Sequence, residues 1–265
     1  AAPSFDRAAR RFRAADQFDD AKNAYFGAAE SYIESESFVL AAQAFEQCAL
    51  IHEAKDESRE ASCMYREAAM SYSVDGKPDQ AAIYLCKAGR ALVTEILEGA
   101  VALHRDAVTL AISDDVVESN GQNFRGTTPM LKTLRDAFNF YCEYAQYDAA
   151  LALAPRMEIM MTDMGQNLEL RHFYLCETIM TLNCSGYVAA DELFRSSHLQ
   201  KTAYLTSKEC KLEEDLLTSF KNYDQGTLDR IKNEYRMQQI NRHIVKVLKR
   251  LTLDGCGAVP PVEEF

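Results

Sequence analysis

The sequence of 265 residues is poor in the residues that make turns and rich in those that make helices. It has no tryptophan, only 6 prolines and 11 glycines, whereas alanine recurs in every segment. Sandwich and barrel folds need many turns that contain glycine or proline, so this composition argues against them. No apolar run approaches the roughly 20 residues of a membrane-spanning helix, and no signal peptide is recognisable at the start. We expect an all-α protein.

Sequence motifs of catalysis, nucleotide binding and metal binding are also missing. The chain has no Walker A loop, no dinucleotide-binding glycine motif, no H-E-x-x-H and no G-x-S-x-G. His172 and Cys176 have helical spacing, but a structural zinc ion takes four ligands and this pair supplies two. The run Glu213-Glu214-Asp215 is typical of a solvated helix face, because adjacent helix positions do not converge. We predict no catalytic residue, no cofactor, no metal and no small-molecule substrate.

Eight cysteines are present, and none forms a C-x-x-C pair. Seven of them fall within helical patterns, where they replace small or apolar residues. This usage indicates reduced cysteines that act as small buried hydrophobic residues, as in a cytoplasmic protein.

The net charge of −11 argues against a nucleic-acid partner, since phosphate binding needs a basic face. The charge is distributed unevenly. Residues 14–60 carry 11 acidic and 3 basic residues, while residues 228–253 carry 7 basic and 2 acidic ones. The chain is therefore electrostatically polarised from end to end.

A repeat of 20 residues dominates the first half of the chain. Its fourth and eleventh positions are small in every unit, and large apolar residues stand between them at spacings of three and four, which is helical periodicity. Small residues let neighbouring helices approach closely. Two units make a hairpin of about 40 residues, so we predict a TPR-like right-handed solenoid of antiparallel helix hairpins. The units begin at Phe18, Phe38, Ser58, Pro78 and Leu97, with echoes at Tyr147 and Tyr187.

The pattern predicts three regions. We expect the solenoid over residues 1–195, interrupted by a long loop between about 112 and 129, then a C-terminal helical bundle over 196–253 and a flexible tail over 254–265. The bundle begins with a charged helix at Lys208. A last helix is expected from Thr227 to Leu251, with a possible break near Gln239. Its apolar stripe should pack on the preceding helix.

Short sequence segments in both halves of the chain resemble those of the SNAP family, the soluble NSF attachment proteins. In the first half they are Gln17-Phe18-Asp19-Asp20-Ala21-Lys22 and Gly76-Lys77-Pro78-Asp79-Gln80-Ala81-Ala82, and this half is most similar to the gamma branch. In the second half they are Ser207-Lys208-Glu209-Cys210-Lys211-Leu212, the pair Leu216-Leu217, and Lys249-Arg250-Leu251-Thr252-Leu253.

The resemblance implies an adaptor that binds SNARE four-helix bundles and recruits the AAA+ ATPase NSF to disassemble them in vesicular transport. It also implies a cytoplasmic location with peripheral membrane contact. A SNARE bundle is long and acidic, so spaced basic side chains in the central units are the candidate contacts. They are Lys87, Arg90, Arg105, Arg125, Lys132 and Arg135.

By the same resemblance, a leucine near the C-terminus stimulates the ATPase, with Leu251 and Leu253 as candidates beside Lys249 and Arg250. We expect Leu253 to lie beyond the apolar stripe and to be exposed. Acidic residues that alpha-type members place after the Leu-Leu pair are replaced here by Thr218, Lys221 and Asn222. The alternative that composition and repeat leave open is a generic TPR-like scaffold that binds peptide tails of another complex.

Overall fold

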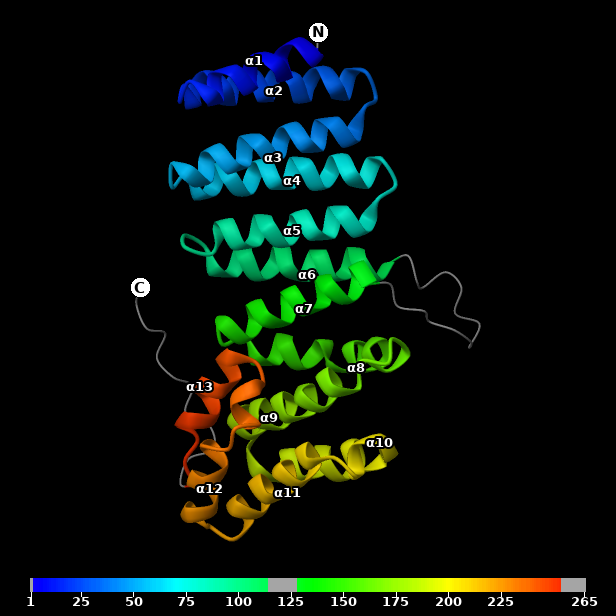
Figure 1. Cartoon of the computed structure of the whole chain (residues 1–265), viewed down its shortest axis with the longest axis vertical. Coiled ribbons are helices and arrows are strands. Elements are labelled where there is room, and N and C mark those ends of the chain that lie inside the picture. Colours follow the sequence, from blue (N-terminus) through cyan, green and yellow to red (C-terminus); the bar gives the residue numbers. More distant parts are fainter. Residues whose placement is uncertain (1, 114–127, 254–265) are drawn as a thin grey trace. The chain divides into compact units, whose positions relative to one another are not determined.

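A computed structural model describes residues 2–113 and 128–253, and these residues contain helices and turns but no strand. The chain divides into two compact units, Ala1–Ala137 and Phe138–Phe265, and the helix α7 (Thr128–Glu143) contains the boundary. The predicted all-α fold is confirmed. The first unit (Figure 1) contains α1 (Ala2–Ala14), α2 (Phe18–Glu34), α3 (Phe38–Ala54), α4 (Ser58–Val74), α5 (Pro78–Leu92) and α6 (Leu97–Ser113).

The 20-residue repeat corresponds to single helices of the first unit. Each helix from α2 to α6 begins at the first residue of a repeat unit, and consecutive helices pack against each other as antiparallel neighbours. The small residues at the fourth and eleventh positions have no solvent exposure in any of the five units. They form the lines along which neighbouring helices approach, as the TPR-like pattern requires. These residues are Ala21, Ala41, Ala61, Ala81 and Ala100, followed by Ala28, Cys48, Ala68, Ala88 and Ala107.

The turns explain why the period is 20. Each of the first four links is three residues long, and its middle residue has a positive φ: Asp16, Glu36, Asp56 and Gly76. The third residue then donates its N–H to a carbonyl five residues earlier, as Ser37 N does to Tyr32 O at 2.8 Å and Lys77 N to Tyr72 O at 2.9 Å. This Schellman arrangement satisfies free carbonyls at the helix end and reverses the chain in three residues.

The weakest unit of the repeat, α6, departs from the others at His104, which replaces a large apolar residue. His104 is fully buried, and a Cβ added to Gly89 of α5 would lie 2.5 Å from its Nδ1. Burial lowers the pKa of His104 to about 4, so the ring is neutral and its Nδ1–H donates to Ala100 O at 2.8 Å. Gly89 and His104 are therefore a matched pair in which the missing side chain of one accommodates the ring of the other.

The second unit continues with longer and less regular elements. Its longest helix, α9, turns sharply at Gly186, whose φ of 83° and ψ of −178° are not helical. This kink comes directly before Tyr187, where the sequence predicts a new repeat unit. The elements are α8 (Tyr147–Asp163), α9 (Asn167–Ser196), the 3-10 turn η2 (His198–Gln200), α10 (Thr202–Leu205), α11 (Lys208–Lys221), α12 (Gln225–Lys232), the 3-10 turn η3 (Met237–Gln239) and α13 (Arg242–Arg250).

The terminal helix expected from Thr227 to Leu251 is interrupted: the predicted break near Gln239 is confirmed, since α13 begins only at Arg242, but the interruption starts earlier, at Asn233. The segment forms α12, η3 and α13, because Asn233 ends α12 and Asn241 caps α13 by accepting the N–H of His243. The predicted apolar stripe is buried at Ile244, Val247 and Leu248. However, α13 packs mainly on α9 and not on α11.

One further expectation, the burial of the cysteines, needs revision. The seven cysteines within the described ranges are free thiols, but Cys63 and Cys184 are exposed, so only the other five are small buried residues. Within those same ranges no helix is long and apolar enough to cross a membrane. The predicted change from solenoid to bundle at residues 195–196 lies inside the second unit and stays a prediction. The predicted loop largely, and the predicted tail wholly, fall outside the described residues.

Candidate functional site

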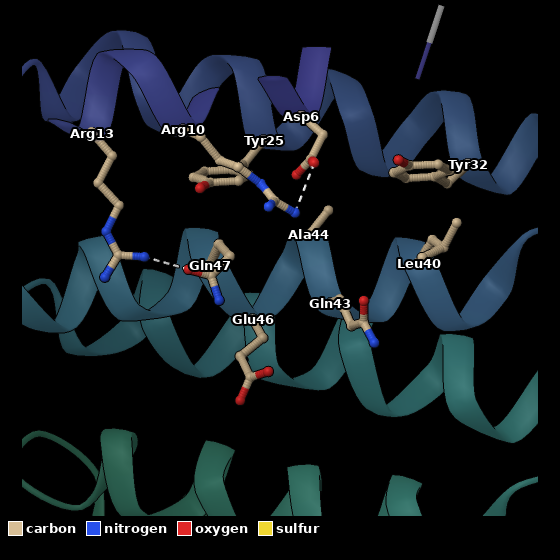
Figure 2. A pocket seen from close by; sticks show the side chains of 10 residues that line it. All are labelled: Asp6, Arg10, Arg13, Tyr25, Tyr32, Leu40, Gln43, Ala44, Glu46 and Gln47. Carbon is tan, nitrogen blue, oxygen red and sulfur yellow. Dashed lines mark hydrogen bonds and ion pairs between the residues drawn. The ribbon is translucent and has the colours of Figure 1, made fainter. Parts of the chain in front are cut away.

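A groove of about 590 Å³ opens between α1 and α3, with tyrosines of α2 contributing to its lining. Figure 2 shows Arg13 extending from α1 toward Gln47 of α3, to which it donates a hydrogen bond. Arg10 pairs with Asp6 on the same helix, with 2.9 Å between Nη2 and Oδ2. The lining residues of this N-terminal groove are Asp6, Arg10, Arg13, Tyr25, Tyr32, Leu40, Gln43, Ala44, Glu46 and Gln47.

The sequence of α1 accounts for the groove. Ala2 and Ala9 are buried and Phe12 packs in the core beside α2, which leaves the basic residues for the remaining faces of the helix. Residues 2–14 contain four arginines and one acid, Asp6. Two of these arginines, Arg10 and Arg13, reach the groove, where guanidinium groups and phenol rings can together contact a carboxylate or an aromatic side chain.

Lys87, a predicted contact residue, lies on α5 in a second polar cluster. Its Nζ is 2.6 Å from Glu46 Oε1 and 4.3 Å from the ring centre of Tyr84. The Tyr84 hydroxyl donates to the other oxygen of Glu46 at 2.7 Å. Burial and the hydrogen bond to Glu46 raise the pKa of Tyr84, so its hydroxyl stays protonated and remains a donor.

This cluster constrains what Lys87 can do. Its charge is compensated by Glu46 and its ammonium rests on a tyrosine face, so the lysine acts first as a link between α5 and α3. Glu46 also lines the N-terminal groove. The contacts Arg13–Gln47 and Lys87–Glu46 thus join α1, α3 and α5 along one layer of the first unit.

The other predicted basic contacts do not form one cluster with Lys87. Arg90 is exposed on α5, whereas Arg105 is exposed on α6, the antiparallel partner of α5. Lys132 is exposed at the start of α7, and Arg135 is half-buried and has interactions of its own. Arg125 lies outside the described residues. The five described positions therefore lie on both layers of the helix stack, and the role of all six candidates in binding stays a prediction.

Of the C-terminal candidates, one is buried in the fold and three are at least partly accessible to a partner. Leu251 is buried, and its carbonyl accepts a hydrogen bond from Lys232 Nζ at 2.7 Å. Leu253 is half-buried, and not fully exposed as expected. Lys249 and Arg250 are exposed in the last turn of α13. A leucine that must reach a partner is consequently Leu253 and not Leu251.

Polar residues meet in the interior of the second unit, where none was expected. Glu213 of α11 is fully buried and accepts hydrogen bonds from His198, Thr178 and Tyr204. The prediction that Glu213 lies on a solvated face is therefore wrong, although its neighbour Glu214 is exposed. No group of three or more histidine, cysteine or acidic side chains in the described part of the chain is arranged to hold a metal ion.

A smaller cavity of about 340 Å³ lies between α9 and α11 in the second unit. Thr218 and Lys221, two of the residues that replace the acidic positions of alpha-type members, line it together with Glu214 and Arg195. Both signs of charge are present, so the cavity has no marked preference for an anionic or a cationic ligand.

Comparison with known proteins identifies the family. The model of the family described as soluble NSF attachment protein, SNAP, matches residues 1–252. The chain belongs to the SNAP family. It is 23% identical to a gamma-soluble NSF attachment protein of Dictyostelium discoideum over 263 residues, which cover 99% of this chain and 78% of the relative. It is 22% identical to a gamma-soluble NSF attachment protein of Arabidopsis thaliana over 255 residues, covering 96% and 84%.

This SNAP family member has site features that sequence reasoning missed. The N-terminal groove was not predicted, although the density of arginine in residues 7–13 was a usable signal. The His198–Glu213 pair had no such signal, because the two residues come from different elements and each alone looks like an ordinary polar residue. The gamma names of both relatives agree with the branch that the first half resembles.

Proposed function

We propose that this SNAP family chain is an adaptor that binds assembled SNARE complexes and recruits and stimulates the AAA+ ATPase NSF for their disassembly. The observation that carries the proposal is the match of the family model along residues 1–252. The names of the two relatives, which describe attachment to NSF, support the same role. The adaptor would work in the cytoplasm at membrane surfaces, during vesicular membrane fusion and protein transport, and would perform no catalysis itself.

Features of the first unit support a rod-shaped partner. Parallel helices of one layer repeat at regular intervals, so their exposed side chains form a series and not a single pocket. Arg90 on α5 and the groove arginines of α1 lie along that layer. A series of spaced cations suits an acidic helical bundle, for which it supplies orientation and association rate more than affinity.

Two binding measurements and one kinetic measurement test the proposal. The chain should bind a preassembled SNARE four-helix bundle more tightly than the individual SNARE helices, and it should bind the ATPase more tightly when the bundle is present. Steady-state ATP hydrolysis should rise only when chain, bundle and ATPase are combined. Binding of neither the bundle nor the ATPase by folded protein would reject the adaptor role.

A second candidate function is a scaffold for peptide tails of another complex. The N-terminal groove favours it, because a cavity of about 590 Å³ with two arginines and two tyrosines suits a short segment of extended chain. Substituting Arg10 and Arg13 with Gln separates the two functions. A scaffold that uses the groove would lose its peptide, whereas an adaptor that uses the whole layer would retain most of its binding to the bundle.

A further inference from the structure

Five large apolar side chains are exposed on α2 and α4 of the first unit, and four of them lie between the centre of a helix and its last turn. Phe26 and Ile33 of α2 are each 40% exposed, and Met70 and Val74 of α4 are 56% and 60% exposed. We call these four residues the α2/α4 patch. Single exposed apolar residues are common, but a group of them on neighbouring helices marks an interaction surface.

The two helices run in the same direction and contribute to one core cluster, in which Met64 of α4 packs against residues that include Ala21 and Tyr25 of α2. Alternate helices of an antiparallel stack run in the same direction, and α2 and α4 are separated by α3 alone (Figure 1). Lys55, in the turn before α4, pairs with Asp19 in the first turn of α2 at 2.5 Å, which aligns the starts of the two helices. Ile33 and Val74 are therefore both in the last turn of parallel neighbours, and Phe26 and Met70 are closer to their centres.

The fold does not need apolar residues at these positions. Arg66 of α4 occupies the repeat position of Phe26, Glu30 of α2 that of Met70, and Ser73 that of Ile33. Each of these equivalents is polar and exposed. Phe26 does contact Phe45, with 6.0 Å between ring centres, but more than half of the surface of Met70 and of Val74 is exposed to solvent. Packing within the first unit consequently accounts for part of the Phe26 side chain but does not explain Met70 and Val74.

Carboxylates flank the patch residues along the two helices: Glu30 is four residues after Phe26, and Glu67 is three residues before Met70. Glu30 and Glu34 of α2 are exposed and Glu67 of α4 is half-buried, and none of the three has an ion-pair partner within the described residues. Arg66 is the one cation that α4 adds between Glu60 and Val74. The surface is therefore apolar at its centre and acidic overall.

We propose that the α2/α4 patch docks a basic amphipathic helix of a partner protein. Such a helix presents apolar side chains at spacings of three and four to the patch, and its lysines or arginines then reach Glu30, Glu34 and Glu67. A second copy of this chain would bring like charges together, and an anionic bilayer would meet the same carboxylates, so both are disfavoured. The surface belongs to α2 and α4 and is separate from the groove that α1 and α3 form.

The probe is a fluorescent synthetic helix of about 18 residues, five helical turns, with leucine on one face and lysine on the other. A peptide of the same composition in scrambled order and one with glutamate in place of lysine are its comparators. The variants are Met70→Ser/Val74→Ser, which removes apolar surface, and Glu30→Lys/Glu34→Lys, which reverses charge. Matched controls are Leu168→Ser/Val188→Ser and Asp163→Lys/Glu192→Lys, exposed residues of α8 and α9 in the second unit.

Fluorescence anisotropy should show binding of the amphipathic peptide, weakened by about tenfold or more in each patch variant and by less than about twofold in the controls. The comparator peptides should bind weakly to every protein. Equal loss in patch and control variants, or equal binding of the scrambled peptide, would overturn the proposal. Concentration-dependent dimerisation lost in the Met70→Ser/Val74→Ser variant would assign the patch to a second copy instead, and patch-dependent binding to phosphatidylserine vesicles would assign it to a membrane.

Discussion

His198 Nδ1 lies 2.6 Å from Glu213 Oε1, and neither side chain has any exposure to solvent. The pair joins η2 to α11, and the other imidazole nitrogen of His198 lies 3.3 Å from Glu177 of α9. The Tyr174 ring packs against the imidazole at a tilt, with 4.5 Å between centres. A buried histidine between two carboxylates is held as the imidazolium, so this interior contains a charge network that ties three elements together.

Breaking this pair on one side should destabilise the protein more than removing both partners. His198→Gln leaves the Glu213 charge uncompensated in the interior, with a cost of about 3–5 kcal/mol for a broken buried ion pair, and Glu213→Gln leaves His198 paired with Glu177 alone. The double variant should be destabilised less than His198→Gln alone, and therefore by less than the sum of the two single losses, since neither charge of the pair then remains. Urea unfolding followed by circular dichroism measures the three differences. Additive losses would mean that the two residues contribute independently.

The same network predicts a pH dependence of stability. Burial alone would lower the pKa of His198, but hydrogen bonds and charge interactions with Glu177 and Glu213 outweigh it and raise the pKa from 6.5 to about 9. A group whose pKa is higher in the folded state contributes stability that is complete below the unfolded value and is lost as pH rises through the folded value. The unfolding free energy of the wild type relative to His198→Gln should therefore fall between pH 6.5 and about pH 9. A constant difference across that range would contradict the charged state of His198.

Substitution of one turn residue by glycine should stabilise the protein. Ala145, between α7 and α8, has a φ of 55°, a conformation that a side chain with a Cβ disfavours and glycine does not. Ala145→Gly should raise the unfolding free energy by up to about 1 kcal/mol, less the larger chain entropy of glycine in the unfolded state. Ala152→Gly, at an exposed position inside α8, is the control and should lower it by about 0.5–1 kcal/mol. Thermal unfolding of the two variants should move in opposite directions.

Sequence periodicity was sufficient for the repeated part of this fold because the same physical requirement recurs there. A small residue such as Ala61 is needed wherever two helices cross, and a reversal such as Ser35-Glu36-Ser37 is needed every 20 residues. The second unit offers no recurring requirement. The break of the terminal helix depends on side-chain caps at single positions such as Asn241, and the burial of Glu213 depends on His198, which is 15 residues away. Contacts that occur once leave no period in the sequence.

The sequence was sufficient to predict that the candidate basic contacts are cations on helix surfaces, but not which of them lie together or which are neutralised by a neighbouring helix. Lys87 illustrates the reason: its partner Glu46 is 41 residues away, and only the packing of α3 beside α5 brings the two together. A sequence pattern reports that a lysine is on a helix surface, but not whether a neighbouring helix neutralises it. The structure therefore favours Arg90 and Lys132 over Lys87 as side chains available to a partner.

Lys132 is suited to a charge-reversal test, because it is exposed on α7, whereas Arg135 is half-buried with intramolecular contacts. Lys132→Glu should weaken binding of a SNARE bundle by about two- to fivefold at low salt, the range that a single exposed charge supports. The difference should shrink at physiological salt, where exposed charges are screened beyond about 8 Å. Lys211→Glu, on α11, is the control in the same titration. Equal affinities of Lys132→Glu and wild type at low salt would remove Lys132 from the binding surface.

The last prediction concerns the two terminal leucines. Leu251 is 4% exposed, so Leu251→Ala should cost about 2–4 kcal/mol of stability. A loss of ATPase stimulation in that variant would therefore not be distinguishable from a loss of folded protein. Leu253 is half-buried and lies beyond α13, so Leu253→Ala should cost about 1 kcal/mol or less.

If a C-terminal leucine stimulates the ATPase, Leu253→Ala should leave binding of the SNARE bundle unchanged and lower bundle-dependent ATP hydrolysis. Steady-state hydrolysis assays with wild type, Leu253→Ala and the conservative Leu253→Met measure this effect, and the methionine variant should retain most of the stimulation because its side chain is of similar size. Full stimulation by a normally folded Leu253→Ala protein would place the ATPase contact elsewhere, with the exposed side chains of Lys249 and Arg250 as the next positions to substitute.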